Sequence, residues 1–189
     1  MHRLQIALTK GRLQDKSVEL FEKSGIDCAP IRDPGRRLIH PLPDYPMDAF
    51  LAKAPDVITY VEHGVCDLGI VGKDTILEKG PSFYEVLDLG FGRCKFALAA
   101  PKGTDLYSGY HTRMSASKYP NVTRAFFDKK GMDVNIIKIE GSVELAPIVG
   151  LADAIVDIVE TGATLKANGL EVIEDVAPIS ARLIVNTAS

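Results

Sequence analysis

Residues 153–165 read Asp-Ala-Ile-Val-Asp-Ile-Val-Glu-Thr-Gly-Ala-Thr-Leu, and this stretch decides the fold class. Its first half is almost continuously apolar, which is typical of a strand covered on both faces of a sheet. A tight Thr-Gly-x-Thr loop follows, and then the start of a helix. A buried strand that turns directly into a helix is the repeating unit of α/β proteins.

The same alternation recurs along the chain. Apolar runs predict strands at residues 4–8, 67–71, 95–100, 134–139, 154–159 and 181–185. Helices are predicted over 11–24 and 120–130, each stopped by the glycine that follows. We therefore expect a largely parallel α/β architecture, with a lobe boundary near residues 89–93, where two glycines interrupt the pattern.

Composition excludes several classes of protein. The chain has 189 residues, of which 46% are apolar and 25% charged, and its net charge is −3. These values are ordinary for a globular protein and unlike those of a disordered chain or a general nucleic-acid binder. No apolar run approaches the ~18 residues of a membrane span, and the first residues lack the pattern of a signal peptide. We therefore expect a cytoplasmic protein that binds neither membrane nor nucleic acid.

Several catalytic motifs fail on inspection. Residues 69–74, Gly-Ile-Val-Gly-Lys-Asp, look like part of a P-loop, but Asp67 replaces the first glycine and Asp74 replaces the final Ser or Thr. Neither the histidines nor the three scattered cysteines have the spacing of metal ligands. The sequence therefore predicts no metal site built by the protein itself.

The loop that follows residue 160 suits a phosphate. Gly162 allows close approach of the backbone, and the hydroxyl groups of Thr161 and Thr164 flank Gly162 and Ala163. Asp153 and Asp157 are predicted to share one face of the strand, with Asp157 near the end where α/β sheets bind ligands. Alternatively, Thr161 merely caps a helix and the aspartates are solvated.

A second segment, Glu140-Gly141-Ser142-Val-Glu144, follows a predicted strand. Ser142 is predicted to cap the next helix, and the carboxylates are suited to sugar hydroxyls or to a phosphate-bound Mg²⁺. A capped surface helix is the alternative.

A third segment is basic. Lys10, Gly11 and Arg12 follow the first predicted strand, where parallel sheets bind anions. Arg32 lies in a Pro-rich excursion over residues 30–55, together with the pair Arg36 and Arg37. These cations either converge on a polyphosphate or are scattered solvated charges.

The order of these segments resembles one family, the ATP phosphoribosyltransferases of histidine biosynthesis. The resemblance covers nearly the whole chain and is strongest over residues 150–165. The blocks that carry it are residues 8–13, 60–64, 67–74, 88–94, 117–123, 141–147, 150–165 and 181–186.

The resemblance implies a two-lobe α/β fold like that of type II periplasmic binding proteins, with a central cleft. Lobe I would comprise residues 1–88 and 175–189, on the side of ATP and pyrophosphate. Lobe II would comprise residues 89–174 and bind phosphoribosyl pyrophosphate. The implied reaction joins N1 of ATP to C1 of this donor and releases pyrophosphate.

The resemblance also implies a role for each segment. The donor would be held by Glu140, Gly141, Ser142, Asp153, Asp157, Thr161, Gly162, Ala163 and Thr164. The ATP side would consist of Lys10, Gly11, Arg12, Arg32 and Asp74, with Arg12 and Arg32 stabilising the departing pyrophosphate. Because adenine N1 already carries a lone pair, the reaction needs positioning and charge stabilisation from arginines and substrate-bound Mg²⁺ rather than a strong base.

The chain ends without the additional regulatory domain of the family's long form, so the resemblance implies the short form. A short-form chain is expected to form a homodimer alone and a hetero-oligomer with a regulatory subunit that resembles histidyl-tRNA synthetase. Two alternatives remain: a solute-binding module on the same fold, and an inactive scaffold.

Overall fold

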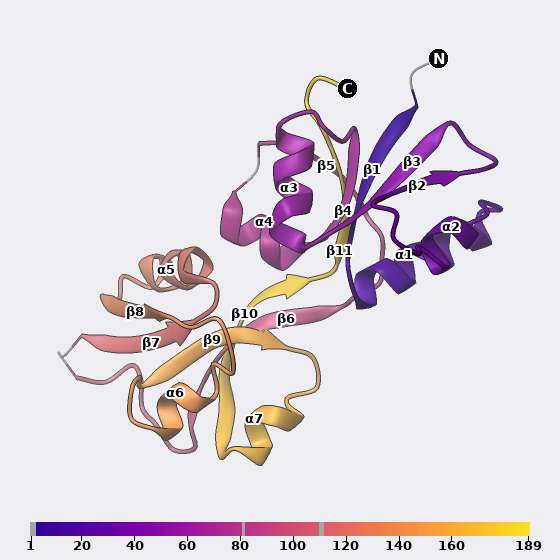
Figure 1. Ribbon diagram of the computed structural model, residues 1–189. Helices are drawn as coiled ribbons and strands as arrows, with labels where there is room; N and C mark the ends of the chain where they lie inside the picture. Colours follow the sequence, from indigo (N-terminus) through magenta and orange to yellow (C-terminus); the bar gives the residue numbers. More distant parts are fainter. Residues whose placement is uncertain (1–2, 81, 110–111) are drawn as a thin grey trace. The chain divides into compact units, whose positions relative to one another are not determined.

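The computed structural model describes residues 3–80, 82–109 and 112–189 (Figure 1). The chain divides into two compact units: unit 1 runs up to Gly92 and resumes over Ser180–Ser189, and unit 2 comprises Arg93–Ile179. Both divisions lie slightly further along the chain than the expected lobe boundaries. The second one shifts because a long strand, β10 (Leu170–Ile179), pairs along its length with β6 (Cys94–Pro101) and so belongs to unit 2.

Unit 1 contains a mixed sheet with the order β2-β3-β1-β4-β11-β5. Its strands are β1 (Leu4–Thr9), β2 (Ile39–Leu42), β3 (Met47–Ala52), β4 (Leu68–Gly72), β5 (Tyr84–Asp88) and β11 (Ala181–Val185). Strand β1 is parallel to β3 and β4, whereas β2, β11 and β5 are antiparallel to their neighbours.

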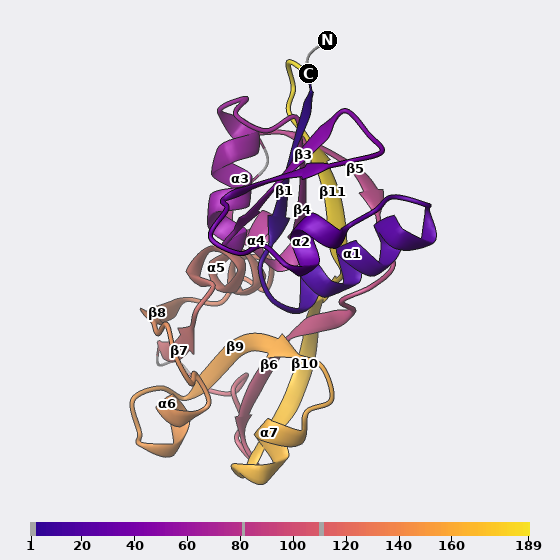
Figure 2. The same cartoon turned by 45° about the vertical axis from the view of Figure 1, so that its right-hand side comes forward.

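Helices cover both faces of this sheet (Figures 1 and 2). On one face, Val18 of α1 (Arg12–Lys23) and Ile31 of α2 (Ala29–Arg32) pack against the apolar side chains of β1. On the other, the buried side of α3 (Ala54–Glu62) packs with α4 (Lys73–Lys79). Two-sided coverage explains why β1 and β4 are continuously apolar.

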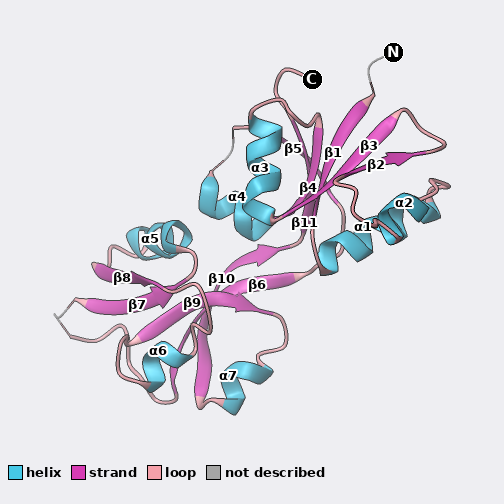
Figure 3. Ribbon diagram, in the orientation of Figure 1, coloured by secondary structure: helices cyan, strands magenta, loops and turns pink. Residues whose placement is uncertain are grey.

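Unit 2 contains a second mixed sheet, with the order β10-β6-β9-β7-β8 (Figure 3). Its further strands are β7 (Arg113–Ser117), β8 (Val134–Lys138) and β9 (Ala154–Val159). Its helices are α5 (Pro120–Lys129), α6 (Leu145–Ile148) and α7 (Ala163–Ala167). Strand β7 is parallel to β8 and β9, and β6 is antiparallel to β9 and β10. Phe126 and Phe127 of α5 pack into one core of the sheet, and Leu165 of α7 into another.

The structure confirms each predicted strand and both predicted helices, but it corrects the expectation of a largely parallel sheet. Each unit has three neighbouring parallel strands; antiparallel strands lie on both sides of them in unit 1 and only on the β9 side in unit 2. Of the antiparallel strands, β2, β5 and β10 were not predicted, whereas β6 and β11 were predicted as strands without their direction. Strand β2 forms a hairpin with β3 within the Pro-rich excursion. Within the described residues, no helix has the length and hydropathy needed to cross a membrane.

Candidate active site

The parallel strands β8, β7 and β9 of unit 2 end side by side. The chain leaves β7 toward β8 on one side, and β9 lies on the other side of β7. Neighbouring parallel strands whose connections run in opposite directions leave a crevice at their carboxyl ends, where α/β proteins bind ligands. The segments that meet at this edge begin at Lys118, Ile139 and Glu160.

The loop between β9 and α7 exposes hydroxyl and backbone donors. Gly162 has φ 75°, in the left-handed region, and it precedes the first residue of α7. The Thr161 hydroxyl accepts a hydrogen bond from the Ala163 N–H at 3.3 Å, and the side chains of Thr161 and Thr164 are both exposed. The predicted strand, loop and helix start are therefore all present. The alternative, in which Thr161 caps the helix, differs from the structure: the N-cap position of α7 is Gly162, and no described side chain caps it.

Asp157 is the half-buried carboxylate of this edge. Its Oδ1 accepts a hydrogen bond from the Ile158 N–H at 2.8 Å. Burial raises the pKa of the Asp157 carboxyl; the Ile158 N–H lowers it, the nearby Glu144 raises it, and Lys118 lowers it. A desolvated carboxylate at a strand end is typical of a functional position.

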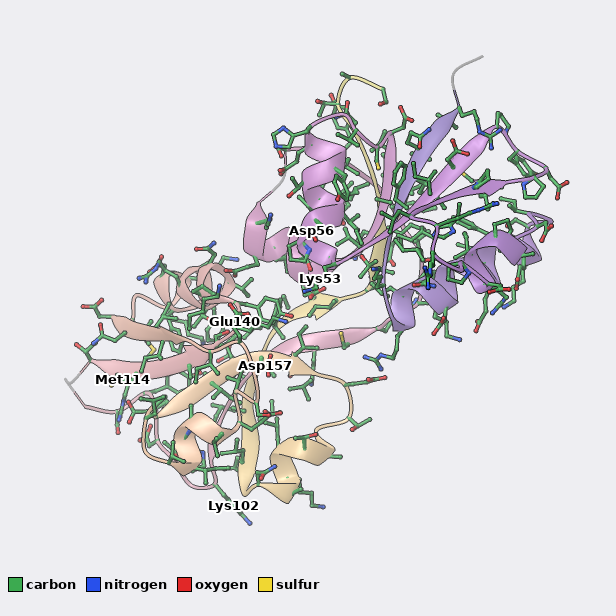
Figure 4. All side chains as sticks on the ribbon, viewed as in Figure 1. Lys53, Asp56, Lys102, Met114, Glu140 and Asp157 are labelled. Carbon is green, nitrogen blue, oxygen red and sulfur yellow. The ribbon has the colours of Figure 1, made fainter. Side chains whose placement is uncertain are left out.

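Glu140 lies in the next loop and is exposed. Its carboxylate pairs with Lys138 Nζ at 2.8 Å, and this hydrogen bond lowers the pKa of Glu140, to which Lys118 also contributes. Glu140 and Asp157 are both labelled in Figure 4. A side chain on Gly141 would meet no described atom within 4 Å, so the backbone there is open to a ligand.

The prediction for Ser142 as a helix cap is wrong. Helix α6 begins after Glu144, and no side chain in the described part of the chain caps it. Instead, the Ser142 carbonyl accepts a hydrogen bond from the Leu145 N–H at 3.2 Å, which closes a backbone turn. The Ser142 hydroxyl is exposed at the same edge as Glu140.

Asp153 lies apart from the other predicted donor residues. It precedes β9, and its Oδ2 accepts a hydrogen bond from the Met114 N–H at 2.8 Å, near the beginning of β7. Four residues of strand separate it from Asp157, about 13 Å. Met114 and Asp157 mark these opposite ends of the sheet in Figure 4. Asp153 and Asp157 were predicted to share one face of the strand because strand side chains alternate with a period of two. That alternation does not bring the two carboxylates to the same ligand.

Lys118 lies at the same edge, and the sequence analysis assigned it no role. It follows β7 directly, and the Ser117 hydroxyl donates to the Val156 carbonyl at 2.6 Å, which places Lys118 beside Asp157 across the strand pair. The Ile139 N–H donates to the Ser117 carbonyl at 3.1 Å, which holds the end of β8 at the same level. The available signal was a lysine between the end of β7 and Pro120, the first residue of a helix.

Unit 1 repeats this arrangement with β3, β1 and β4. Lys10 follows β1, and its N–H donates to the Ala52 carbonyl at 2.8 Å. Gly11, with φ 90°, opens α1, and the exposed Arg12 is the first residue of that helix. Lys53, which the sequence analysis missed, follows β3 at the same edge (Figure 4).

Asp74 belongs to the same edge, after β4. A Cβ on Gly72 would lie 2.1 Å from Asp74 Oδ1 and 3.8 Å from Leu13 Cδ1. The Asp74 carboxylate therefore folds back over Gly72, on the side of the first turn of α1.

A pocket of about 730 Å³ opens beside Lys10. Its cationic lining is supplied by Lys10, Arg36 and Arg37, and the remainder is mostly apolar and aromatic. Because Arg36 and Arg37 are exposed, their charges are accessible to an anion. Arg32 is absent from the described lining of this pocket; its guanidinium is paired with Glu22 of α1.

The described residues contain no group of three or more His, Cys, Asp or Glu side chains arranged to hold a metal ion.

Comparisons with known proteins point to one family. The sequence profile of the HisG family, ATP phosphoribosyltransferase, matches residues 53–189. An ATP phosphoribosyltransferase of Clostridium kluyveri is 61% identical over 187 residues, which cover 99% of this chain and 85% of the relative.

Solved structures extend the comparison to the fold. The ATP phosphoribosyl transferase (HisG:HisZ) complex of Thermotoga maritima has a chain similar to this one with a TM-score of 0.83 at 37% identity, covering 98% of this chain and 89% of that chain. The periplasmic aliphatic sulphonate binding protein SsuA of Escherichia coli matches with a TM-score of 0.59 at 15% identity, covering 100% and 62%. The second likeness concerns the fold alone, and it confirms the predicted resemblance to periplasmic binding proteins.

Proposed function

The chain belongs to the ATP phosphoribosyltransferase family, whose reaction is the first step of histidine biosynthesis, and from this premise we propose how its two sheet edges divide the work. The edge of unit 2 binds phosphoribosyl pyrophosphate, and the edge of unit 1 binds the phosphates of ATP and the departing pyrophosphate. The convergence of Lys118, Glu140 and Asp157 at neighbouring strand ends carries the first part of this proposal.

The 5-phosphate of the donor occupies the loop of Thr161, Gly162, Ala163 and Thr164. Two exposed hydroxyls and the open backbone at a helix start supply hydrogen-bond donors there. The Asp157 carboxylate accepts hydrogen bonds from the ribose hydroxyls. One of its oxygens accepts the Ile158 N–H, and no hydrogen bond from a described residue occupies the other.

Glu140, Gly141 and Ser142 form the rim of the same site, and Lys118 offsets its negative charge. Asp153 does not contact the donor; its carboxylate holds the start of β9 by accepting the Met114 N–H. Its contribution is to the position of the strand that carries Asp157.

On the ATP side, Lys10, Gly11 and Arg12 stand at the end of β1, and Asp74 stands across from them at the end of β4. Arg36 and Arg37 share a pocket with Lys10 and supply cationic charge there. Unlike Arg32, they are not held by the Glu22 carboxylate. Arg32 joins them only if substrate displaces it from Glu22.

The chemistry requires no general base. The N1 lone pair of adenine forms the new bond to C1 of the ribose, and the C1–O bond breaks as pyrophosphate leaves with its electron pair. Positive charge grows on the ribose and negative charge on pyrophosphate, so carboxylates beside the ribose and arginines beside the leaving group both stabilise the transition state. Mg²⁺ would be held by the substrate phosphates and would supply neutralisation of part of their charge.

The regulatory partner and the cellular location belong to the same proposal. The Thermotoga maritima relative is a HisG:HisZ complex, which supports a hetero-oligomer with a regulatory subunit for this chain. We extend the proposal to a homodimer of the isolated chain and to a cytoplasmic location, where ATP and the donor are both available.

Mass spectrometry tests the proposed reaction directly. Full-length chain is mixed with ATP, phosphoribosyl pyrophosphate and Mg²⁺, and N1-(5-phosphoribosyl)-ATP and pyrophosphate are measured together. We expect both products to appear in equal amounts. Binding of both substrates without either product would overturn the proposal in favour of a binding module.

A further inference from the structure

Ion pairs and hydrogen bonds join β4, β5 and β11 of unit 1 into a closed ring at the edge that carries Asp74. The members of the ring, in order of contact, are Lys73, Glu85, Arg182, Asp88 and Ser180.

The Glu85 carboxylate bridges the two cations of the ring. Its Oε2 lies 2.5 Å from Lys73 Nζ, and its Oε1 lies 3.1 Å from Arg182 Nη1. All three side chains are about three-quarters buried, with exposed fractions of 22–25%. Partial burial strengthens these pairs relative to ion pairs at the open surface.

Asp88 and Ser180 close the ring. Arg182 Nη2 lies 3.2 Å from Asp88 Oδ2, and the Ser180 hydroxyl donates to Asp88 Oδ1 at 2.9 Å. The Ser180 carbonyl then accepts the Lys73 N–H, also at 2.9 Å. Strand register supports the geometry, because Arg182 lies opposite both Val71 of β4 and Asp88 of β5.

The ring fixes Lys73 by its side chain and by its backbone. Lys73 is the lysine of the segment that fails as a P-loop, and the structure directs its ammonium group to Glu85. The next residue is Asp74, whose carboxylate occupies the space that a side chain on Gly72 would need. The ring therefore holds the backbone directly before Asp74.

We propose that Arg182 is a positioning residue for the ATP side: through Glu85 and Lys73 it holds the β4–α4 junction so that Asp74 faces the ends of β1 and α1. This inference rests on the proposed placement of Asp74 toward ATP. The contacts of Arg182 favour a positioning role, since each of its two terminal nitrogens pairs with a carboxylate of the ring.

Steady-state kinetics with both substrates test the inference. In Arg182→Met, KM for ATP should rise about tenfold, because a displaced Asp74 would lose one charge-assisted hydrogen bond to ATP. KM for the donor should change by less than about twofold. Lys73→Met should have the same effect, and Lys73→Arg, which keeps the pair with Glu85, should restore KM for ATP. Because both residues act through one ring, the double variant should be no worse than the more severe single variant.

A matched control is Lys130→Met. It breaks the pair of Lys130 with Glu174 in unit 2, where the lysine side chain is 29% exposed, and KM for ATP should not change. Equal increases of both KM values, or additive effects of Arg182→Met and Lys73→Met, would show that the ring is merely structural and overturn the inference. If Arg182→Met does not fold, Lys73→Met and Lys73→Arg decide. Asp74→Asn distinguishes failure of the positioning role of Arg182 from failure of the proposed function. An unchanged KM for ATP in that variant would refute the placement of Asp74 on the ATP side.

Discussion

Arg32 donates two parallel hydrogen bonds to the Glu22 carboxylate, from Nε to Oε1 and from Nη2 to Oε2, and both are 2.7 Å long. This fork joins the end of α2 to α1, and the hydrogen bond raises the pKa of Arg32 and lowers that of Glu22. A guanidinium held in this way must lose both bonds before it can bind pyrophosphate. Arg36 and Arg37, which line the pocket beside Lys10, face no such competition from Glu22.

The first prediction compares these arginines. Arg36→Ala or Arg37→Ala should lower the single-turnover rate by about tenfold or more, because a charge-assisted contact in the transition state contributes roughly 1.5–3 kcal/mol. Arg32→Ala should keep the rate and reduce stability only slightly, since its ion pair with Glu22 is exposed to solvent. Rapid-quench measurement with saturating substrates distinguishes them.

Glu22→Gln is the control for Arg32, because it releases the guanidinium without removing it. An unchanged single-turnover rate in both Glu22→Gln and Arg32→Ala would show that Arg32 only joins α2 to α1. A loss of rate in Arg32→Ala that matches Arg36→Ala would return Arg32 to the pyrophosphate site.

The second prediction concerns Asp157. Its pKa is raised above the ordinary 3.8, chiefly by burial, so the folded protein holds this proton more tightly than the unfolded chain. Stability from this group is therefore present below pH 3.8 and is lost as pH rises through the raised pKa. At neutral pH the ionised carboxylate opposes folding, and Asp157→Asn should raise Tm.

The same variant should weaken donor binding. Loss of a charged acceptor for ribose hydroxyls corresponds to roughly 1.5–3 kcal/mol, or more than tenfold in Kd. In the unmodified protein, donor affinity should fall as pH drops through the pKa of Asp157, and this step should vanish in Asp157→Asn. Calorimetry at several pH values measures both effects, and a variant with lower Tm or unchanged affinity would contradict the assignment.

The third prediction concerns Lys118, whose charge lowers the pKa of both Asp157 and Glu140. Lys118→Met should weaken donor binding about fivefold, since the lysine is exposed and partly screened. It should also move the pH step of donor binding upward, because Asp157 loses a favourable neighbour. Lys129→Met, at the far end of α5, is the matched control and should change neither quantity. A pH step that stays in place in Lys118→Met would separate Lys118 from Asp157.

Much of the fold could be predicted because its buried strands are continuous apolar runs. β1, β6 and β9 have this pattern, and glycines end α1 and α5 where expected. The antiparallel edges could not be predicted in the same way. Exposed positions in β5 and alternating burial in β2 leave no continuous run, and Pro41 in β2 argues against a strand unless it lies at an edge.

Prediction of the candidate site was likewise limited to residues that are close in sequence. Local chemistry identified the loop at Thr161 and the carboxylate Asp157, because both lie within one strand–loop–helix segment. Partners brought together by strand pairing were missed: Lys118 reaches Asp157 across β7 and β9, and Glu22 reaches Arg32 across two helices. Asp153 shows the converse, since its proximity in sequence to Asp157 does not bring it to the same end of the sheet.

The fourth prediction separates backbone strain from function by means of two glycines. Gly162 and Gly169 have φ of 75° and 72°, so alanine at either position should cost about 1–2 kcal/mol and lower Tm by several degrees. Neither methyl group would clash: at Gly162 the nearest described atom is Val159 Cγ1 at 3.9 Å, and at Gly169 no described atom lies within 4 Å.

Gly162 lies in the proposed phosphate loop, whereas Gly169 lies beyond the end of α7. Gly162→Ala should therefore raise KM for the donor strongly, because the backbone can no longer approach the 5-phosphate, while Gly169→Ala should lose stability alone. Equal KM values in the two variants at matched loss of Tm would show that the loop at Gly162 does not contact the donor, and the phosphate assignment would fall with it.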